Sequence, residues 1–552
     1  MAAHPHKRTQ RDSYVFCQLD AVYRDMLQPL TNLEVLDLAH NHLFRIPPHC
    51  FDDMTKMKLL SLSNNQIEHF FDGLLCDVSS LEVLLLQDLP LTSFPANLFE
   101  CGSDFQSSLK IIDISHSKIS TLKKGDFQSL KHLGLLDLSY NNLDTLPEEP
   151  FLGLSSLQTL DMSGNSFIEL PTTLCVGDLF NLQELHLQGN AISYIAPHWF
   201  INMTELQIID MSKNKLSIIS DGLFSTLPKL EELSLKGNGL TIDSAKDLFH
   251  ESRLMRRLDL SENNIRNIDN LLDGTSMRHV EHLDLSFNNI SAIRAPLNKR
   301  NESVSLKWLN LESCGIESVV RDAFVHMEVL EYVKLVNNSI TFVPLFDARL
   351  GAMFFFRGNP IICSCGMVWL EERWLDTDTV DKMSTYDYDV DVCRTYPSMM
   401  VKPIRHLSDR EFMCPVPSNC PPECDCFVLK EGGSVYITVC RNNLTDIPQN
   451  LPHDSEYLYL DGNNFHTVQR ISKGFHYTEN VFLNNSGVVS FGEDVFKDFS
   501  HVFVIDISFN DLKSLPTSIF QGLKYLKDIN LKHNHLTHIS EGLLKNVPHS
   551  KT

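Results

Sequence analysis

The sequence predicts an α/β solenoid, in which short units of one kind stack into a long shared core. Three observations predict this fold class. A ladder of apolar residues returns mostly every 24 to 26 residues, an Asn stands at one fixed place in it, and two groups of cysteines lie where the ladder stops and restarts. A unit of this length cannot bury its apolar face alone, so such units have to stack.

The ladder has the form LxxLxLxxNxL, as in Leu133, Leu136, Leu138 and Asn141. Thirteen copies begin at Leu33, Met57, Leu81, Leu109, Leu133, Leu157, Leu182, Leu206, Leu230, Met255, Val280, Leu306 and Leu330, and a degenerate fourteenth carries Phe354, Phe356, Asn359 and Ile361. This spacing is typical of leucine-rich repeats. It predicts a curved horseshoe with a parallel β-sheet on the concave face and loops and short helices on the convex face.

Each position of the repeat has a physical role. The two leucines of LxL point into the core from a short strand, and the residues beside them face solvent on the concave side. The Asn side chain lies inward and bonds the backbone of neighbouring coils. A later Phe fills the convex half, at Phe51, Phe127, Phe151, Phe200, Phe224 and Phe324. Cys314 replaces the Asn as an accepted alternative, whereas Leu89 and Ser117 are expected to weaken the ladder locally.

Eight of the fourteen cysteines fall between residues 363 and 440. The first four end the long array and the next four precede a second one, where the open apolar end of a solenoid needs a cap. Both groups resemble the cysteine caps of leucine-rich arrays. That resemblance implies the bridges Cys363–Cys393, Cys365–Cys414, Cys420–Cys426 and Cys424–Cys440, and a short helix beginning at Trp369 and Leu370. Zinc is the rival interpretation of the CxC and CxxxC spacings, but zinc sites favour CxxC.

The other cysteines are expected to be less informative. Cys175 and Cys314 are predicted to be buried and free, and Cys17 falls at a ladder position. Cys50, Cys76 and Cys101 lie at similar phases of successive repeats, and a bridge among them is disfavoured over free thiols. Disulfides require an oxidising compartment.

Repeats resume after the cysteines, with strand positions that include Leu458, Val481, Ile505 and Ile529. The chain is therefore divided into a partial repeat at 1–26, a first array of about 14 repeats at 27–362, a C-terminal cysteine cap at 363–414, an N-terminal-type cysteine cap at 420–452 and a second, uncapped array of about 4 repeats at 453–552. It begins inside a repeat, with no signal peptide in the first 24 residues, and has no run of about 18 apolar residues. We interpret the sequence as truncated at both ends.

The net charge of −23 argues against nucleic acid as a partner, since phosphates need a basic surface. An acidic surface suits a soluble protein or one that meets a basic partner. Modest support for an extracellular location comes from six glycosylation sequons. They begin at Asn202, Asn289, Asn301, Asn337, Asn443 and Asn484.

Motifs of catalysis and of cofactor or metal binding were sought and are not found: the sequence holds no Gly-rich phosphate loop, GxSxG or HExxH. The pairs His40/His42 and His533/His535 flank a ladder Asn, which favours solvent-facing edge histidines over metal ligands. Acidic residues gather in the first cap, at Asp376, Asp378, Asp381, Asp387, Asp389 and Asp391. No EF-hand loop is completed, so a solvated acidic face that could dock a basic protein is favoured over calcium.

A long array closed by CxCxMxWL and followed directly by a CPxxCxC cap and a short array resembles the Toll-family receptors with internal cysteine clusters. Cys363, Cys365, Met367, Trp369 and Leu370 match the first cap of that family. Cys420, Pro421, Cys424, Cys426 and the YLDGNN segment at 459–464 match the second. The absent N-terminal cap and Ser364, where the family usually has Asp, are departures. Slit-type guidance proteins alternate caps in the same order but have short arrays, and chaoptin-like adhesion proteins lack the internal cap pair.

The resemblance implies an ectodomain on the extracellular side of the plasma membrane, part of a single-pass receptor, or secreted if this fragment is the natural product. It would bind a Spätzle-like cystine-knot cytokine or a microbial product and form a ligand-induced homodimer that joins cytoplasmic TIR domains. A further cysteine cap, one transmembrane helix and the TIR domain would follow Thr552. The alternative is an adhesion or guidance protein without a signalling domain. Neither interpretation is an enzyme.

Overall fold

The computed structural model describes most of the repeats and part of the cysteine-rich region. The described residues are 11–13, 18–102, 107–170, 178–196, 199–220, 222–241, 253–268, 277–298, 304–346, 352–367, 388–389, 392–395, 399–403, 407, 411–416, 420–429, 435–441, 443–471 and 474–544. The chain forms two units. The first comprises residues 1–339, 346–358 and 385–389, and the second comprises 340–345, 359–384 and 390–552.

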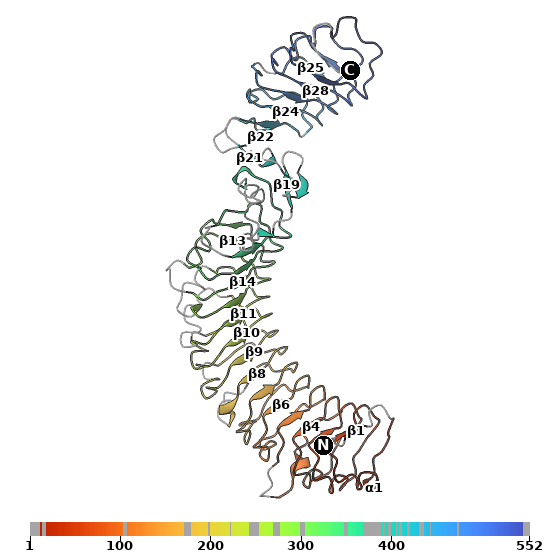
Figure 1. Ribbon diagram of the computed structural model, residues 1–552, viewed down its shortest axis with the longest axis vertical. Helices are drawn as coiled ribbons and strands as arrows, with labels where there is room; N and C mark the ends of the chain where they lie inside the picture. The colour runs from red at the N-terminus through yellow and green to blue at the C-terminus, as the bar shows by residue number, and fades with distance from the viewer. Residues whose placement is uncertain are drawn as a thin grey trace, which may run out of the picture. The chain divides into compact units, whose positions relative to one another are not determined.

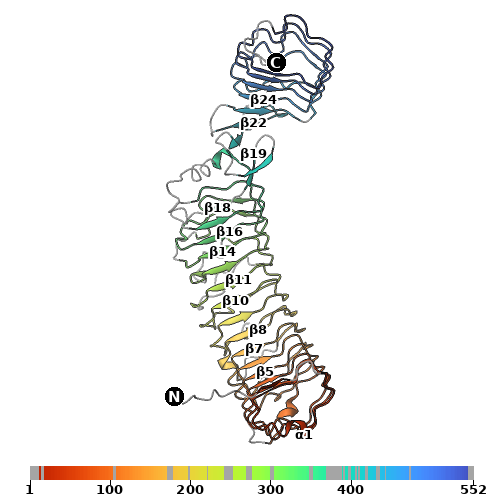
Figure 2. The ribbon, with the colours of Figure 1, turned by 45° about the vertical axis from the view of Figure 1, so that its right-hand side comes forward.

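The first unit is a leucine-rich-repeat solenoid built on one long parallel sheet. Its strands lie side by side in sequence order (Figures 1 and 2), from β1 to β18. They are β1 (Arg11–Ser13), β2 (Val35–Asp37), β3 (Leu59–Ser61), β4 (Val83–Leu85), β5 (Ile111–Asp113), β6 (Leu135–Asp137), β7 (Thr159–Asp161), β8 (Glu184–His186), β9 (Ile208–Asp210), β10 (Glu232–Ser234), β11 (Arg257–Asp259), β12 (His282–Asp284), β14 (Trp308–Asn310), β16 (Tyr332–Lys334), β17 (Met353–Phe355) and β18 (Tyr388–Asp389). A small parallel pair, β13 (Ala292–Ile293) and β15 (Ser318–Val319), lies apart from this sheet.

The leucine ladder becomes the core. In the three-residue strands from β2 to β17 the middle residue is buried and its two neighbours are more exposed; Leu136, for example, is fully buried. On the other side of the coil the repeated phenylalanines stack from one repeat to the next, with ring centroids 5.8 Å apart for Phe127 and Phe151. Helices in the described part of the first unit are short: α1 (Arg24–Leu27), η1 (Ala96–Phe99) and η3 (Leu179–Asn181). The stacking therefore rests on apolar burial between repeats rather than on independent helices.

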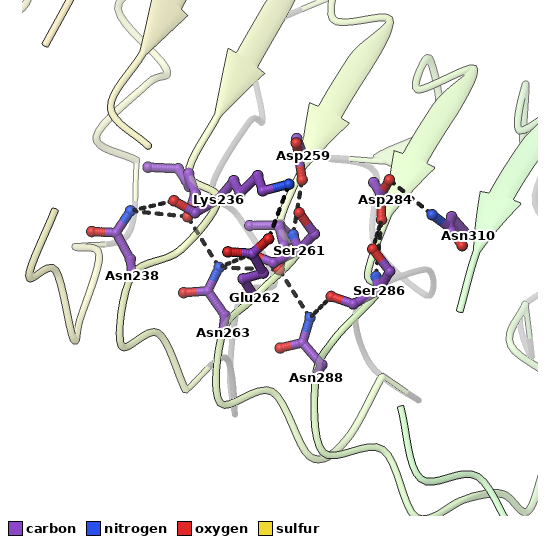
Figure 3. A network of polar contacts seen from close by, with 12 residues as sticks. Lys236, Asn238, Asp259, Ser261, Glu262, Asn263, Asp284, Ser286, Asn288 and Asn310 are labelled. Carbon is purple, nitrogen blue, oxygen red and sulfur yellow. Dashed lines mark hydrogen bonds and ion pairs between the residues drawn. The ribbon is translucent and has the colours of Figure 1, made fainter. Parts of the chain in front are cut away.

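The ladder asparagines join each coil to the one before it. The Asn141 side-chain amide donates to the carbonyl oxygens of Leu138, at 3.1 Å, and of Ile114 in the preceding coil, at 3.0 Å. Its Oδ1 accepts the Ile119 amide N–H at 3.0 Å. Asn238, Asn263 and Asn288 occupy the same place in three successive coils (Figure 3). Each of these buried or half-buried side chains thus satisfies backbone groups that no strand or helix reaches.

Two deviations in the ladder behave differently. The Cys314 thiol donates to the Leu285 carbonyl of the preceding coil at 3.1 Å, so cysteine keeps the donor function of Asn. Ser117 offers only its hydroxyl oxygen, which accepts the Leu89 amide N–H at 3.3 Å. Ser117 therefore makes one of the backbone bonds that a ladder Asn makes, and the ladder is weaker here, as expected.

The second unit carries its own repeats. A seven-stranded sheet runs β21 (Cys414–Pro415), β22 (Asp425–Val428), β23 (Ile437–Val439), β24 (Tyr457–Tyr459), β26 (Asn480–Phe482), β28 (Val504–Asp506) and β29 (Asp528–Asn530). Its first two pairings are antiparallel and the rest are parallel, so the hairpin of the cysteine-rich segment leads into the repeats. Two small pairs accompany it: β19 (Val392–Thr395) with β20 (Met400–Pro403), and β25 (Thr467–Val468) with β27 (Ser490–Phe491). A short η5 (Cys365–Met367) precedes them.

Replacing Asn141 with Ala should lower the free energy of unfolding by roughly 1–3 kcal/mol, because the buried Ile119 amide and two carbonyls lose their partner. Denaturant unfolding followed by circular dichroism measures this. The neighbouring Asn142→Ala is the matched control, since Asn142 is exposed and lies one residue beyond the ladder position. Equal stability of the two variants would contradict the structural role given to the ladder.

Candidate ligand-binding face of the first unit

The long sheet presents two columns of outward side chains. In β9 the buried Ile209 stands between the partly exposed Ile208 and Asp210, and the other strands repeat this pattern. Strands pair in register, so the residues that begin each strand form a first column and those that end it form a second. Two residues per repeat, one in each column, therefore determine the chemistry of the strand face.

Carboxylates dominate the second column. Between β5 and β12 its members include Asp113, Asp137, Asp161, Asp210, Asp259 and Asp284. We call these six residues the acidic column. It is interrupted by His186 in β8 and by Ser234 in β10. Because neighbouring strands lie about 4.8 Å apart, adjacent carboxylates repel one another.

A recurring turn holds these carboxylates in place. Each aspartate is followed two residues later by a serine, whose amide N–H donates to Oδ1: at 2.9 Å from Ser139 to Asp137 and at 2.8 Å from Ser212 to Asp210. Around Asp284 the Ser286 hydroxyl adds a second bond of 2.6 Å (Figure 3). These bonds favour the charged form of the carboxylate and fix its orientation.

The pKa of Asp137, which lies between Asp113 and Asp161 in the column, reflects both burial and repulsion. Burial raises the pKa of the Asp137 carboxyl, hydrogen bonds from Ser139 lower it, and the charges of Asp113 and Asp161 raise it further. The net result is a pKa above the ordinary value. The column therefore holds negative charge that the protein itself does not fully neutralise.

Next to the column the face is hollowed. A depression of about 320 Å³ is lined by residues from β8 to β14. Asp210, Ser234 and Asp259 of the second column line it, as do Arg257 and Trp308 of the first. This is a shallow surface site, which suits a side chain of a partner better than a whole small molecule.

The structure brings together all four cysteine pairs expected of the two caps. It joins Cys363 to Cys393, Cys365 to Cys414, Cys420 to Cys426 and Cys424 to Cys440, with Cα–Cα distances of 5.4, 5.1, 5.8 and 4.2 Å. The Met413 amide also donates to the Cys363 carbonyl at 3.3 Å, which ties the two ends of the first cysteine group together. Trp369 and Leu370, expected to begin a helix there, lie outside the described residues.

One expectation about the cysteines is wrong. Cys76 and Cys101, for which free thiols were favoured, form a disulfide with a Cα–Cα distance of 5.3 Å. They are 25 residues apart, about one repeat, so stacking places them in adjacent coils. Repeat spacing was the available signal, although Cys50 has nearly the same spacing from Cys76 and stays free and buried.

Comparisons with known proteins agree with the repeat architecture. A leucine rich repeat family model matches residues 31–90, 107–167, 180–240, 477–536 and 500–551, and a second one matches 276–292. Toll-like receptor 7 of Drosophila melanogaster is 26% identical over 288 residues, which cover 44% of this chain and 18% of that protein. This chain is a leucine-rich-repeat protein with distant similarity to Toll-like receptors.

The chain is also similar to a second kind of leucine-rich-repeat protein and to a solved receptor structure. Keratocan of Mus musculus is 26% identical to the leucine-rich-repeat chain over 307 residues, which cover 55% of the chain and 73% of keratocan. The crystal structure of a TLR13–ssRNA13 complex superposes with a TM-score of 0.59 at 24% identity, covering 68% of this chain and 53% of that one. At this identity the superposition shows the fold alone. The match spans less than a fifth of Toll-like receptor 7 and about half of the TLR13 chain.

Four of the sequon asparagines have accessible side chains. Asn202, Asn289, Asn337 and Asn443 are exposed, and Asn484 is half-buried. Asn301 lies outside the described residues. Exposure permits glycan attachment at the first four.

The histidine pairs are described by the structure, whereas the acidic segment of the first cap lies almost wholly outside the described residues. His40, His42, His533 and His535 are all exposed beside a ladder Asn. Within the described part of the chain, no group of three or more His, Cys, Asp or Glu is placed to hold a metal ion. Of the six cap aspartates only Asp389 is described, as part of β18, so the calcium alternative falls outside the described residues. No described helix is long and apolar enough to cross a membrane.

Two buried thiols should resist alkylation in the folded protein. Burial raises the pKa of both Cys50 and Cys314 to about 11, so at pH 8 only about one thiol in a thousand is ionised. We expect iodoacetamide to leave both unmodified until denaturant is added, as mass spectrometry of their peptides would show.

The same digest without reductant should contain the Cys76–Cys101 peptide pair, and modified Cys76 or Cys101 would refute that bridge.

Asp137→Asn should raise the free energy of unfolding at neutral pH by less than about 1 kcal/mol. A carboxyl whose pKa is raised by folding costs stability above its folded pKa, and this cost disappears as the pH falls towards its unfolded pKa. Asn keeps an oxygen that accepts the Ser139 amide N–H. Denaturant unfolding at several pH values should therefore show a gain at pH 7 that vanishes on acidification. A gain independent of pH would point away from charge.

Proposed function

We propose that the chain is the extracellular ligand-binding region of a Toll-like receptor, which binds a protein ligand on the strand face and dimerises. The observation that carries this proposal is the strand face of the first unit. It is long and rigid, and its acidic column and depression lie on the surface without any covering element among the described residues.

The location is supported by the cysteines and the sequons. Five disulfides join described cysteines, and such bridges persist in oxidising compartments. Exposed sequon asparagines such as Asn202 and Asn337 would be available for glycosylation on the extracellular side of the membrane. The paired cysteine groups, which resemble the internal caps of Toll receptors, support this receptor class.

A protein is favoured over a nucleic acid as the ligand. The solved TLR13 structure holds a single-stranded RNA, but here the strand face carries a row of aspartates and the whole chain has a net charge of −23. Phosphates would be repelled by such a face. A Spätzle-like cystine-knot cytokine is the ligand class that the cap resemblance implies, and a microbial product is the other.

The second candidate function is cell adhesion or guidance without a signalling domain. The match to keratocan, which covers most of that protein, favours it. The two candidates share the binding face and differ in what the bound ligand triggers.

Antibody cross-linking of cells that express the complete gene product would separate them. For a receptor that acts by dimerisation, a bivalent antibody against the first unit should activate a TIR-dependent transcription reporter, and its monovalent Fab fragment should not. Cell aggregation is measured in parallel with the same cells. A silent reporter contradicts the receptor proposal, and aggregation with a silent reporter supports the adhesion alternative.

A further inference from the structure

A small residue separates two carboxylates at one point of the second column. Ser234 pairs in register with Asp210 on one side and with Asp259 on the other. Two strand spacings separate the aspartates, so their backbones are about 10 Å apart with only a hydroxymethyl group between them. Elsewhere in the column, Asp113, Asp137 and Asp161 follow one another directly and leave no such gap.

The two carboxylates that flank the gap retain acceptor capacity. Oδ1 of Asp210 accepts the Ser212 amide N–H at 2.8 Å, and Oδ1 of Asp259 accepts that of Ser261 at 2.9 Å. The second oxygen of each has no hydrogen-bond partner among the residues that the structure describes. By contrast, the second oxygen of Asp284 accepts the Asn310 amide at 2.9 Å (Figure 3).

Nearby cations of the chain are already engaged. Arg257 lines the depression but pairs with Glu232 at 3.0 Å, and Lys236 pairs with Glu262 at 3.1 Å. Among the carboxylates and guanidinium groups that line the depression there are four carboxylates and one guanidinium. The charge of this lining is complementary to a cation.

The lining also offers apolar contact. Ile208 and Trp308 lie towards opposite ends of the depression, and the Trp308 ring is next to His282, with ring centroids 6.2 Å apart. Arginine and lysine side chains combine a charged head with an apolar stem, and an indole ring attracts a cation at its face. Such a side chain matches both the charge and the surface of this site.

We propose that the depression around Ser234 receives one Arg or Lys side chain of the protein ligand, whose cationic head bridges Asp210 and Asp259. This inference rests on the proposed function in one respect, that the strand face of the first unit is where a protein ligand binds. It adds the position of a specificity contact and the chemistry of the ligand residue that makes it.

The test uses a fluorine-labelled nonapeptide of glycine and serine with one central arginine, and the same peptide with neutral citrulline in its place. Binding to the full chain is followed by fluorine NMR line broadening, which detects weak complexes. The arginine peptide should bind, and Asp210→Asn with Asp259→Asn should weaken binding at least about tenfold. Asn keeps the oxygen that accepts the serine amide, so the double variant should fold.

Asp506→Asn is the matched control. Asp506 occupies the same kind of turn in the second unit, with the Ser508 amide on Oδ1 at 2.9 Å, but its second oxygen already accepts the Asn530 amide at 3.0 Å. Peptide binding should be unchanged in this variant. The proposal is overturned by equal binding of the arginine and citrulline peptides, by equal binding of wild type and the double variant, or by no binding to wild type.

A cation placed within the chain provides a second measurement. Ser234→Arg should put a guanidinium between the two aspartates, abolish peptide binding and melt at a higher temperature than Ser234→Met, which fills similar space without charge. A lower melting temperature for the arginine variant would count against the bridge. If the peptides fail to bind but antibody cross-linking activates the reporter, the protein is a receptor that recognises its ligand at another place. If the arginine peptide binds but the reporter stays silent, the site for a basic side chain is present on a protein that does not signal.

Discussion

The buried ladder asparagine is the interaction on which the rest of the structure depends. A leucine-rich coil has three-residue strands and long loops, so many of its backbone groups would be buried without partners. The Asn141 side chain supplies two donors and one acceptor to its own and the preceding coil. Because the same bonds recur from coil to coil, they fix the offset between repeats and with it the register of the strand face.

This dependence explains why the fold could be predicted from sequence and where that prediction weakens. The core positions and the ladder Asn are each specified by a residue type at a fixed spacing, so the strands of the long sheet from β2 to β17 fall on the predicted LxL segments. Cys314 preserves a donor at its ladder position, whereas Ser117 preserves only an acceptor. A serine hydroxyl can both donate and accept, so the residue type alone does not predict how many of these bonds form.

Features that arise only from stacking were harder to predict. Each aspartate of the acidic column looks, in sequence, like a polar residue after a strand, and only the register of several strands aligns them. The Cys76–Cys101 bridge is similar. One repeat separates these cysteines, but nearly the same separation relates Cys50 to Cys76, and the loop conformations decide which pair meets. Periodicity therefore predicts which residues share a side of the coil but not which of them bond.

The rigidity of the register bears on how the strand face could discriminate among ligands. Flexible carboxylates would relax away from one another or close around any cation, and would discriminate little. Here the carboxylates are held by serine amides, and their spacing is set by strands that the ladder keeps in place. Consecutive aspartates offer a crowded negative ridge, while the Ser234 position offers a gap between two of them. A column of evenly spaced charges would attract any basic surface. The gap at Ser234 instead favours a ligand that presents a cation between Asp210 and Asp259.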